Sequence, residues 1–303
     1  MIKLGDYNTL TVVKTVDFGL YLDGGESGEI LLPSRYVPAG VEVGQQIEVF
    51  LYLDQDERLI ATTEHPLAKV GDFAWLEVSW VNQYGAFLNW GLMKDLFCPF
   101  REQKMRMQKG QSYIVRVTID EESYRLMATA KVDKFLLPLT PSSGPFASLD
   151  SFAPSASLDP SAPSAPQKHY VHGTEVDLLV WQKTDLGFKV IIDNCYQGLI
   201  YENQIYQPLH SGDRLKGYID HIRQDGKADV TLQPTGRQHT EAFSEVLLQY
   251  LHDNNGHCDL GDKSPAELIE DRFKVSKKTF KRAAGDLYKR RLITIGPEEI
   301  RLL

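Results

Sequence analysis

The chain has 303 residues, of which 42% are hydrophobic and 24% charged, and its formal net charge is −8. This is an ordinary globular composition, and no stretch approaches the roughly 20 apolar residues of a membrane helix. The acidic balance argues against a simple polybasic nucleic-acid binder but permits a local basic patch. Three separated cysteines and a start, MIKLGDYNTL, without a signal-like apolar run predict a reducing, cytoplasmic location rather than a disulfide framework.

Three segments share one template of alternating strands. They read TVVKTVDFGLYLD from residue 11, WLEVSWVNQYGAFLNW from residue 75 and VDLLVWQKTDLGFKV from residue 176. Each has an alternating strand, a glycine, a second strand, a short apolar strand and, after a polar connection, a closing pair of strands. The period-2 alternation and the turn residues predict a five-stranded barrel of about 60 residues for each segment. The glycines predicted to form a tight barrel corner are Gly19, Gly85 and Gly187.

Residues 140–167 have a different composition, TPSSGPFASLDSFAPSASLDPSAPSAPQ. Ser, Ala and Pro bury too little apolar surface to offset chain entropy, so this stretch is predicted to be a flexible, partly extended linker. The predicted domains are barrels at 1–65, 66–134 and 169–235, a linker at 135–168, and a C-terminal domain at 236–303.

The C-terminal region changes to helical periodicity. AFSEVLLQYLHDN, from residue 242, has apolar residues at helical spacing. SPAELIEDRF predicts a second helix, with Ser264 and Glu267 forming a capping box. Ser276 is predicted to cap a third helix, and LITIGPEEIRLL to form a strand pair. Three helices and a two-stranded wing indicate a winged helix-turn-helix. The predicted fold is therefore mainly β, with tandem five-stranded barrels and a C-terminal α+β domain.

The strand order and the aromatic residues around each glycine resemble the S1 RNA-binding domain, an OB-fold barrel, most clearly in YGAFL of the second repeat. That family carries an aromatic residue before the glycine, another two residues after it, often a His ending strand three, and a basic residue on strand five. The resemblance implies RNA contacts for matching residues, which are Phe18, Tyr21 and Arg58, then Tyr84, Phe87 and Arg125, and in the third repeat Lys189, Tyr201 and Lys227. The His position falls on Leu32, Cys98 and Tyr201.

The aromatic residues have two interpretations. They either pack inside the barrels or form an outer face on which bases stack, which contributes ~1–3 kcal/mol per base. Because the pair recurs in the first two repeats, we favour the outer face for Phe18, Tyr21, Tyr84 and Phe87. By contrast, core or edge packing is predicted for Trp75, Trp80 and Trp90.

A dense basic run coincides with the third predicted helix. Nine Lys and Arg residues lie between Arg272 and Arg291, opposed within that stretch by Asp286 alone. Such a run is either a solvated helix face or a phosphate-binding patch. Its place on the recognition helix favours phosphate contact. The predicted contacts on the first turns are Lys277, Lys278, Lys281 and Arg282.

Three such barrels followed by a winged helix resemble the conserved virulence factor B family of bacterial RNA-binding proteins, and FLNWGLMKDLFCPFREQ from residue 87 looks especially like its second repeat. The resemblance implies a cytoplasmic single-stranded RNA-binding protein that regulates gene expression, transcriptionally or post-transcriptionally. We expect no catalytic residues and no cofactor, because no phosphate loop or nucleophile elbow is present. We also expect no metal site: LHDNNGHCDL, from residue 251, has a spacing that would allow a metal, but its Asn-Asn-Gly is typical of a helix end and turn. Two alternatives remain open: an adaptor on the ribosome or polymerase, and a duplex DNA-binding regulator.

Overall fold

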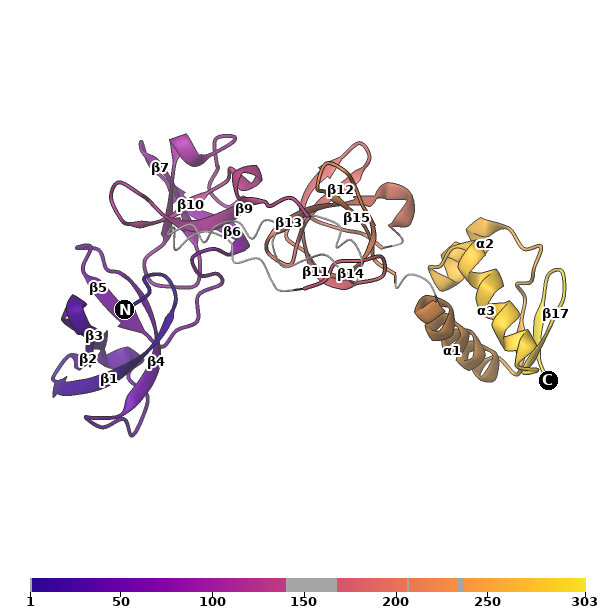
Figure 1. The fold of residues 1–303 in the computed structure, drawn as a ribbon, viewed down its shortest axis with the longest axis horizontal. Coiled ribbons are helices and arrows are strands. Elements are labelled where there is room, and N and C mark those ends of the chain that lie inside the picture. The colour runs from indigo at the N-terminus through magenta and orange to yellow at the C-terminus, as the bar shows by residue number, and fades with distance from the viewer. Residues whose placement is uncertain (1, 140–167, 206, 234–236) are drawn as a thin grey trace, which may run out of the picture. The chain divides into compact units, whose positions relative to one another are not determined.

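The computed structural model describes residues 2–139, 168–205, 207–233 and 237–303. Within them lie three closed five-stranded barrels and a small α+β region with three helices and a three-stranded sheet (Figure 1). The predicted fold class is confirmed. The linker predicted at 140–167 lies outside the described residues. One compact unit holds the first two barrels, and a second holds the third barrel and the C-terminal region.

The first barrel has the strand connectivity of an OB fold. Its strands are β1 (Tyr7–Val16), β2 (Gly19–Asp23), β3 (Glu29–Pro33), β4 (Gln46–Leu53) and β5 (Leu59–Thr62). They close in the order β1-β2-β3-β5-β4, with a parallel pairing of Leu31 with Ile60 between β3 and β5. Closure leaves no open sheet edge and gives every strand one inner and one outer face.

The other two barrels repeat this order. The second is built from β6 (Phe73–Val81), β7 (Gly85–Asn89), β8 (Leu96–Pro99), β9 (Ser112–Ile119) and β10 (Leu126–Thr129). The third is built from β11 (Glu175–Thr184), β12 (Gly187–Ile192), β13 (Tyr196–Tyr201), β14 (Arg214–Ile222) and β15 (Ala228–Thr231). The sequence repeats therefore correspond to structural repeats.

The predicted corner glycines lie where the first and second strands of each barrel meet. A Cβ atom on Gly19 would lie 2.1 Å from the Leu32 carbonyl oxygen, and one on Gly187 would lie 2.0 Å from that of Ile200. Both glycines also have positive φ, at 152° and 141°. The backbone of the third strand passes so close to the corner that only glycine fits there.

Side chains of the first and second barrels meet in one hydrophobic cluster, while the interior of the first barrel forms a cluster of its own. Phe50 and Tyr52 of β4 are buried in the same cluster as Trp90 and Leu96 of the second barrel. The rings of Phe50 and Trp90 meet edge-on with centroids 5.8 Å apart, a favoured aromatic arrangement. This shared cluster fixes the first barrel's β4 strand against the second barrel.

The third barrel draws residues from beyond its strands into its core. Leu139, which the predicted domain boundaries place in the linker interval 135–168, is buried there with Tyr170. The Leu139 amide donates to the Gly226 carbonyl at 2.7 Å, and the Leu137 amide donates to that of Cys195 at 2.9 Å. Thus the described part of the predicted linker includes residues that belong to this barrel's packing.

The C-terminal region has the elements of a winged helix: α1 (Arg237–Asp253), β16 (His257–Cys258), α2 (Ala266–Phe273), α3 (Lys277–Lys289), β17 (Ile293–Ile295) and β18 (Ile300–Leu302). The predicted Ser276 cap is confirmed, because its hydroxyl accepts from the Thr279 amide at 3.3 Å. The capping box predicted at Ser264 is wrong. Its buried hydroxyl instead accepts from the Gly261 amide at 2.8 Å, and Pro265 occupies the cap position. In the described residues, every helix is too short or too polar to span a membrane.

Candidate nucleic-acid interface

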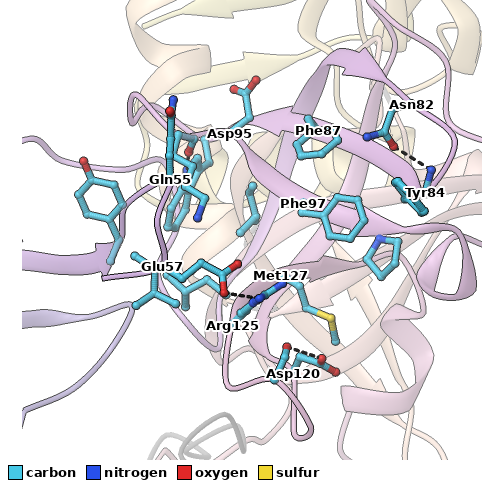
Figure 2. Close-up of a pocket in the computed structure, with 18 of the residues that line it drawn as sticks. Gln55, Glu57, Asn82, Tyr84, Phe87, Asp95, Phe97, Asp120, Arg125 and Met127 are labelled. Atoms are coloured by element: carbon cyan, nitrogen blue, oxygen red, sulfur yellow. Dashed lines mark hydrogen bonds and ion pairs between the residues drawn. The ribbon is translucent and has the colours of Figure 1, made fainter. Parts of the chain in front are cut away.

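Strand register aligns four side chains across the outer face of the second barrel. Trp80 of β6 pairs with Phe87 of β7, Phe87 pairs with Phe97 of β8, and Phe97 pairs with Met127 of β10. Directly paired residues point to the same side of a sheet. Trp80, Phe87, Phe97 and Met127 therefore form a continuous row, hereafter the aromatic row; Figure 2 shows its last three members.

The rings of the aromatic row are stacked on one another. The Trp80 and Phe87 rings are 3.8 Å apart and nearly parallel, at 3°, and the Phe87 and Phe97 rings are 5.0 Å apart at 40°. Trp80 covers one face of Phe87 and is itself 44% exposed. The ring surface available for further stacking therefore belongs to Trp80 rather than to Phe87.

Of the core or edge packing predicted for Trp80, a core position is wrong, and a β-bulge explains why. The β6–β7 register shifts between Val78 and Trp80, and this shift turns Trp80 to the outer face although simple alternation from Val78 points it inward. Trp75 is also 40% exposed. Of the three tryptophans predicted to pack, Trp90 lies in the core, where its indole N–H donates to the Lys94 carbonyl at 2.7 Å.

Tyr84 extends this surface at the barrel corner. It is 65% exposed, as predicted for a surface aromatic residue. The Asn82 side-chain oxygen accepts from the amides of Tyr84 at 2.8 Å and Gly85 at 3.1 Å, which fixes the bend (Figure 2). The backbone at Tyr84 is thus held in place while its ring stays accessible.

A groove with a volume of about 940 Å³ lies beside the aromatic row. Its opposite wall is formed by Tyr52, Leu53, Gln55 and Glu57 of the first barrel. The described charged side chains that line it are Lys94, Arg101 and Arg125 against Glu57, Asp95, Asp120 and Glu122. Burial lowers the pKa of the Lys94 ammonium. With four carboxylates and three cations, the groove favours ring stacking over simple attraction of phosphate.

The three basic residues predicted on the fifth strands are all ion-paired. Arg58 lies 2.9 Å from Asp54 and 2.8 Å from Asp56, and its hydrogen bond with Asp54 raises the pKa of its guanidinium. Arg125 pairs with Glu57, and Lys227 lies 3.1 Å from Asp225. Their placement on the fifth strands is also wrong by one position, because each immediately precedes its strand.

The outer face of the first barrel is less aromatic. Phe18 is exposed and meets Tyr21 edge-on, with ring centroids 6.3 Å apart. Tyr21 pairs across strands with Lys14, whose ammonium lies 4.5 Å from the Tyr21 ring centroid. This barrel thus offers one aromatic pair, as predicted from the sequence.

The third barrel has no aromatic rings at the positions equivalent to Trp80, Phe87 and Phe97. Lys189 of β12 pairs with Gln182 and Leu199, and Leu199 pairs with Asp229. The Tyr201 hydroxyl accepts from Arg223 at 3.0 Å. The third barrel therefore has no counterpart of the aromatic row.

The assignment of the His position in the first two repeats is wrong by one residue. In the structural register, Tyr201 opposes Gly187, just as Pro33 opposes Gly19 and Pro99 opposes Gly85. The predicted residues Leu32 and Cys98 alternate inward and are fully buried. Burial raises the pKa of the Cys98 thiol to about 12, so this group is a neutral core side chain.

The basic face of α3 is partly neutralised. Phe280, Ala284 and Leu287 are buried, and the helical period places Lys278, Arg282 and Lys289 on the opposite side. Lys281, one of the predicted contacts, pairs with Asp262 at 2.9 Å. Other ion pairs of this region join Arg272 to Asp259 and Arg290 to Asp286. Within the described part of the chain, the α3 cations without an ion pair are Lys277, Lys278, Arg282 and Lys289, followed by Arg291 just beyond the helix.

A metal centre has no obvious ligand set here. Groups of three or more His, Cys, Asp or Glu side chains placed to hold an ion do not occur among the described residues. In the LHDNNGHCDL segment, His257 lies 3.2 Å from Glu299 and Cys258 is buried.

Two family models match this chain, one near each end, in the order predicted from the sequence. Residues 4–64 match the family model for the S1 domain, and residues 245–302 match that for the CvfB-like winged helix domain. The uncharacterized protein YitL of Bacillus subtilis is 28% identical over 290 residues, covering 94% of this chain and 89% of YitL. Conserved virulence factor B of Staphylococcus aureus is 20% identical over 269 residues, covering 86% of this chain and 81% of that protein.

A multidomain protein with nucleic acid binding domains from Streptococcus pneumoniae has a solved structure that covers 99% of this chain and 98% of its own, at 20% identity and a TM-score of 0.41. The S1 and winged helix families are nucleic-acid-binding domains and not enzymatic ones. The chain is therefore a homologue of conserved virulence factor B, with an S1 domain at its N-terminal end and a CvfB-like winged helix at its C-terminal end.

Proposed function

We propose that this protein binds single-stranded RNA and regulates gene expression, at the transcriptional or post-transcriptional level. The aromatic row beside the groove is the observation that carries the proposal. Rings exposed in this way bind flat partners, and unpaired bases present flat faces that a duplex hides by stacking. The row therefore favours a single strand over a duplex.

In this proposal an unpaired base stacks on the free face of Trp80, and Tyr84 contacts a neighbouring base. Phe18 and Tyr21 of the first barrel form a second, smaller stacking place. The third barrel contributes polar contacts alone, through Lys189, Tyr201 and Lys227. The winged helix supplies phosphate contacts through the cations of α3 that lack an ion pair.

A duplex DNA-binding role is the second candidate, and it is favoured by the same α3 cations. Recognition helices of winged helices meet the grooves of duplexes. The third candidate is the adaptor on the ribosome or polymerase, which would recognise protein instead of nucleic acid. These readings differ in which ligand competes and in how binding responds to salt.

The test is fluorescence anisotropy with a labelled single-stranded RNA of mixed sequence. Trp80→Ala should weaken binding about 5- to 150-fold, the loss of one base stack. Trp75→Ala is the matched control, because Trp75 lies on the same strand with similar exposure but does not line the groove. Equal losses in the two variants would contradict the stacking role of Trp80.

Two further outcomes decide between the candidate functions. Preferential competition by duplex DNA would support the second candidate. Absence of RNA and DNA binding at low salt would overturn the proposal and direct attention to protein partners.

A further inference from the structure

One turn of the first barrel reaches two of the three cations that line the groove. It connects β4 to β5 and comprises Asp54–Arg58. The Glu57 carboxylate pairs with the Arg125 guanidinium, as Figure 2 shows. The Asp54 carbonyl accepts from the Lys94 ammonium at 2.6 Å. The first barrel therefore occupies charges of the second barrel that a bound phosphate would use.

The third cation of the groove is also engaged, since the Arg101 guanidinium lies 2.9 Å from the Asp120 carboxylate. A phosphate that enters the groove must therefore compete with an oxygen that is already in contact with a cation. Arg125 is the easiest to release, because its side chain is 57% exposed and that of Glu57 is 38% exposed. Exposed pairs of this kind are weak and are screened by salt.

The backbone of Glu57 shows that its side chain is not required by the turn. Glu57 has a φ of 64°, and the residues before Arg125 and Lys227, which are Tyr124 and Gly226, have φ values of 55° and 77°. All three turns thus need a left-handed residue, a conformation best suited to glycine. Of the three residues, Glu57 alone is acidic. The turn would form equally well with glycine at this position, so the fold does not require the negative charge of Glu57.

The position of this turn is fixed by the cluster in which the two barrels meet. β4 leads into the turn, and its Phe50 and Tyr52 are buried in that cluster. Moving the turn as a body would expose these residues. The change that costs least is rotation of the Glu57 side chain away from Arg125, with the backbone left in place.

We propose that Glu57 is an electrostatic gate on the groove: its carboxylate holds Arg125 in the free protein and is displaced by a backbone phosphate of the bound strand. This inference rests on the proposed RNA-binding function. Displacement leaves an unpaired carboxylate near the phosphate, which lowers affinity. A strand that also stacks on Trp80 compensates for that repulsion, whereas a ligand that offers phosphates alone does not. The gate therefore lowers the affinity for every phosphate ligand alike, and a strand that also stacks on Trp80 is the kind that still binds at low concentration.

The test measures the affinity of the full chain for single-stranded RNA at low salt. Glu57→Gln keeps the shape of the side chain and removes its charge, and it should tighten binding about two- to fivefold. Glu122→Gln is the matched control, because Glu122 lines the same groove but pairs with no cation among the described residues. Equal tightening in both variants would mean that net charge alone matters, and the gate would be refuted.

A double-mutant cycle with Arg125→Gln gives a second readout. In the wild-type background the loss of Arg125 should change affinity little, because the guanidinium is occupied. In the Glu57→Gln background the same change should abolish the gain. Additive effects refute the gate. If Trp80→Ala weakens binding but Glu57→Gln does not tighten it, the gate fails and the proposed function stands. If the wild-type chain binds no RNA, both fail.

Discussion

The salt dependence of RNA binding should report the cations of the winged helix that are not ion-paired. For a single strand, each phosphate contact contributes about −0.7 to the slope of log affinity against log salt. The five cations without ion pairs on and just after α3 therefore contribute at most about −3.5. Lys278→Gln/Arg282→Gln removes two of them and should reduce the magnitude of the slope by about 1.4.

The matched control for that experiment is Lys281→Gln/Arg290→Gln on the same helix. Lys281 and Arg290 already pair with Asp262 and Asp286, so fewer counterions are released when they contact a phosphate. The control should change the slope by less than half as much as the test variant. All four side chains are exposed, so folding is little affected. Equal changes in slope would refute the assignment of phosphate contacts to the unpaired cations.

Three further predictions concern stability. Gly19→Ala should destabilise the first unit by about 2–4 kcal/mol in urea unfolding, because its Cβ would lie 2.1 Å from the Leu32 carbonyl oxygen. Gly285→Ala should instead stabilise the winged helix by about 0.5–1 kcal/mol, because a Cβ there meets open space within α3. Burial raises the pKa of the Cys98 thiol from 9.0 to about 12. The thiol of the unfolded chain therefore ionises at lower pH than that of the folded chain, so the free energy of unfolding should fall as pH rises through that interval. Alkylation at neutral pH should leave Cys98 unmodified until the chain unfolds.

Local backbone requirements were the most predictable features of this chain. Gly19, Gly85 and Gly187 were assigned to barrel corners because a glycine between two alternating segments has one common steric explanation. The cap at Ser276 was predictable in a similar way, because a serine just before a segment of helical periodicity can accept a hydrogen bond from the free amides of the first turn. Both features depend on residues close together in the sequence.

Of the four members of the aromatic row, Phe87 was predicted to face outward. Trp80 was assigned to core or edge packing, and strict alternation from Val78 turns it inward. The bulge reverses the alternation of inward and outward side chains, and the sequence repeats contained a sign of this reversal. The positions equivalent to Trp80 are Lys14 and Gln182, both opposite the second-strand residue that faces outward. Polar residues at these positions indicate a solvent-facing site in all three barrels.

The ion pairs that occupy the predicted basic residues could not be predicted. Glu57 and Arg125 belong to different barrels and meet because Phe50 and Trp90 pack in one cluster. Side-chain pairing across such a contact depends on the relative placement of two domains, which periodicity does not encode. The prediction of RNA-contacting cations therefore omits the carboxylates that pair with them.

The aromatic row and the α3 cations that have no ion pair lie in different units of this protein, and this separation makes a final prediction. Trp80 belongs to the first unit and α3 to the second. If one RNA strand contacts both units, Trp80→Ala and Lys278→Gln/Arg282→Gln should each weaken binding, and their free energies should add in the combined variant, because the sites share no contacts. An RNA too short to reach both units binds only one of them at a time, so linked binding of one strand is lost. On such an RNA the loss of binding free energy in the combined variant should be smaller than the sum of the two single losses. The measurement is anisotropy over a series of RNA lengths. Additive losses on the shortest RNA as well would show that the two units do not act as linked sites on one strand.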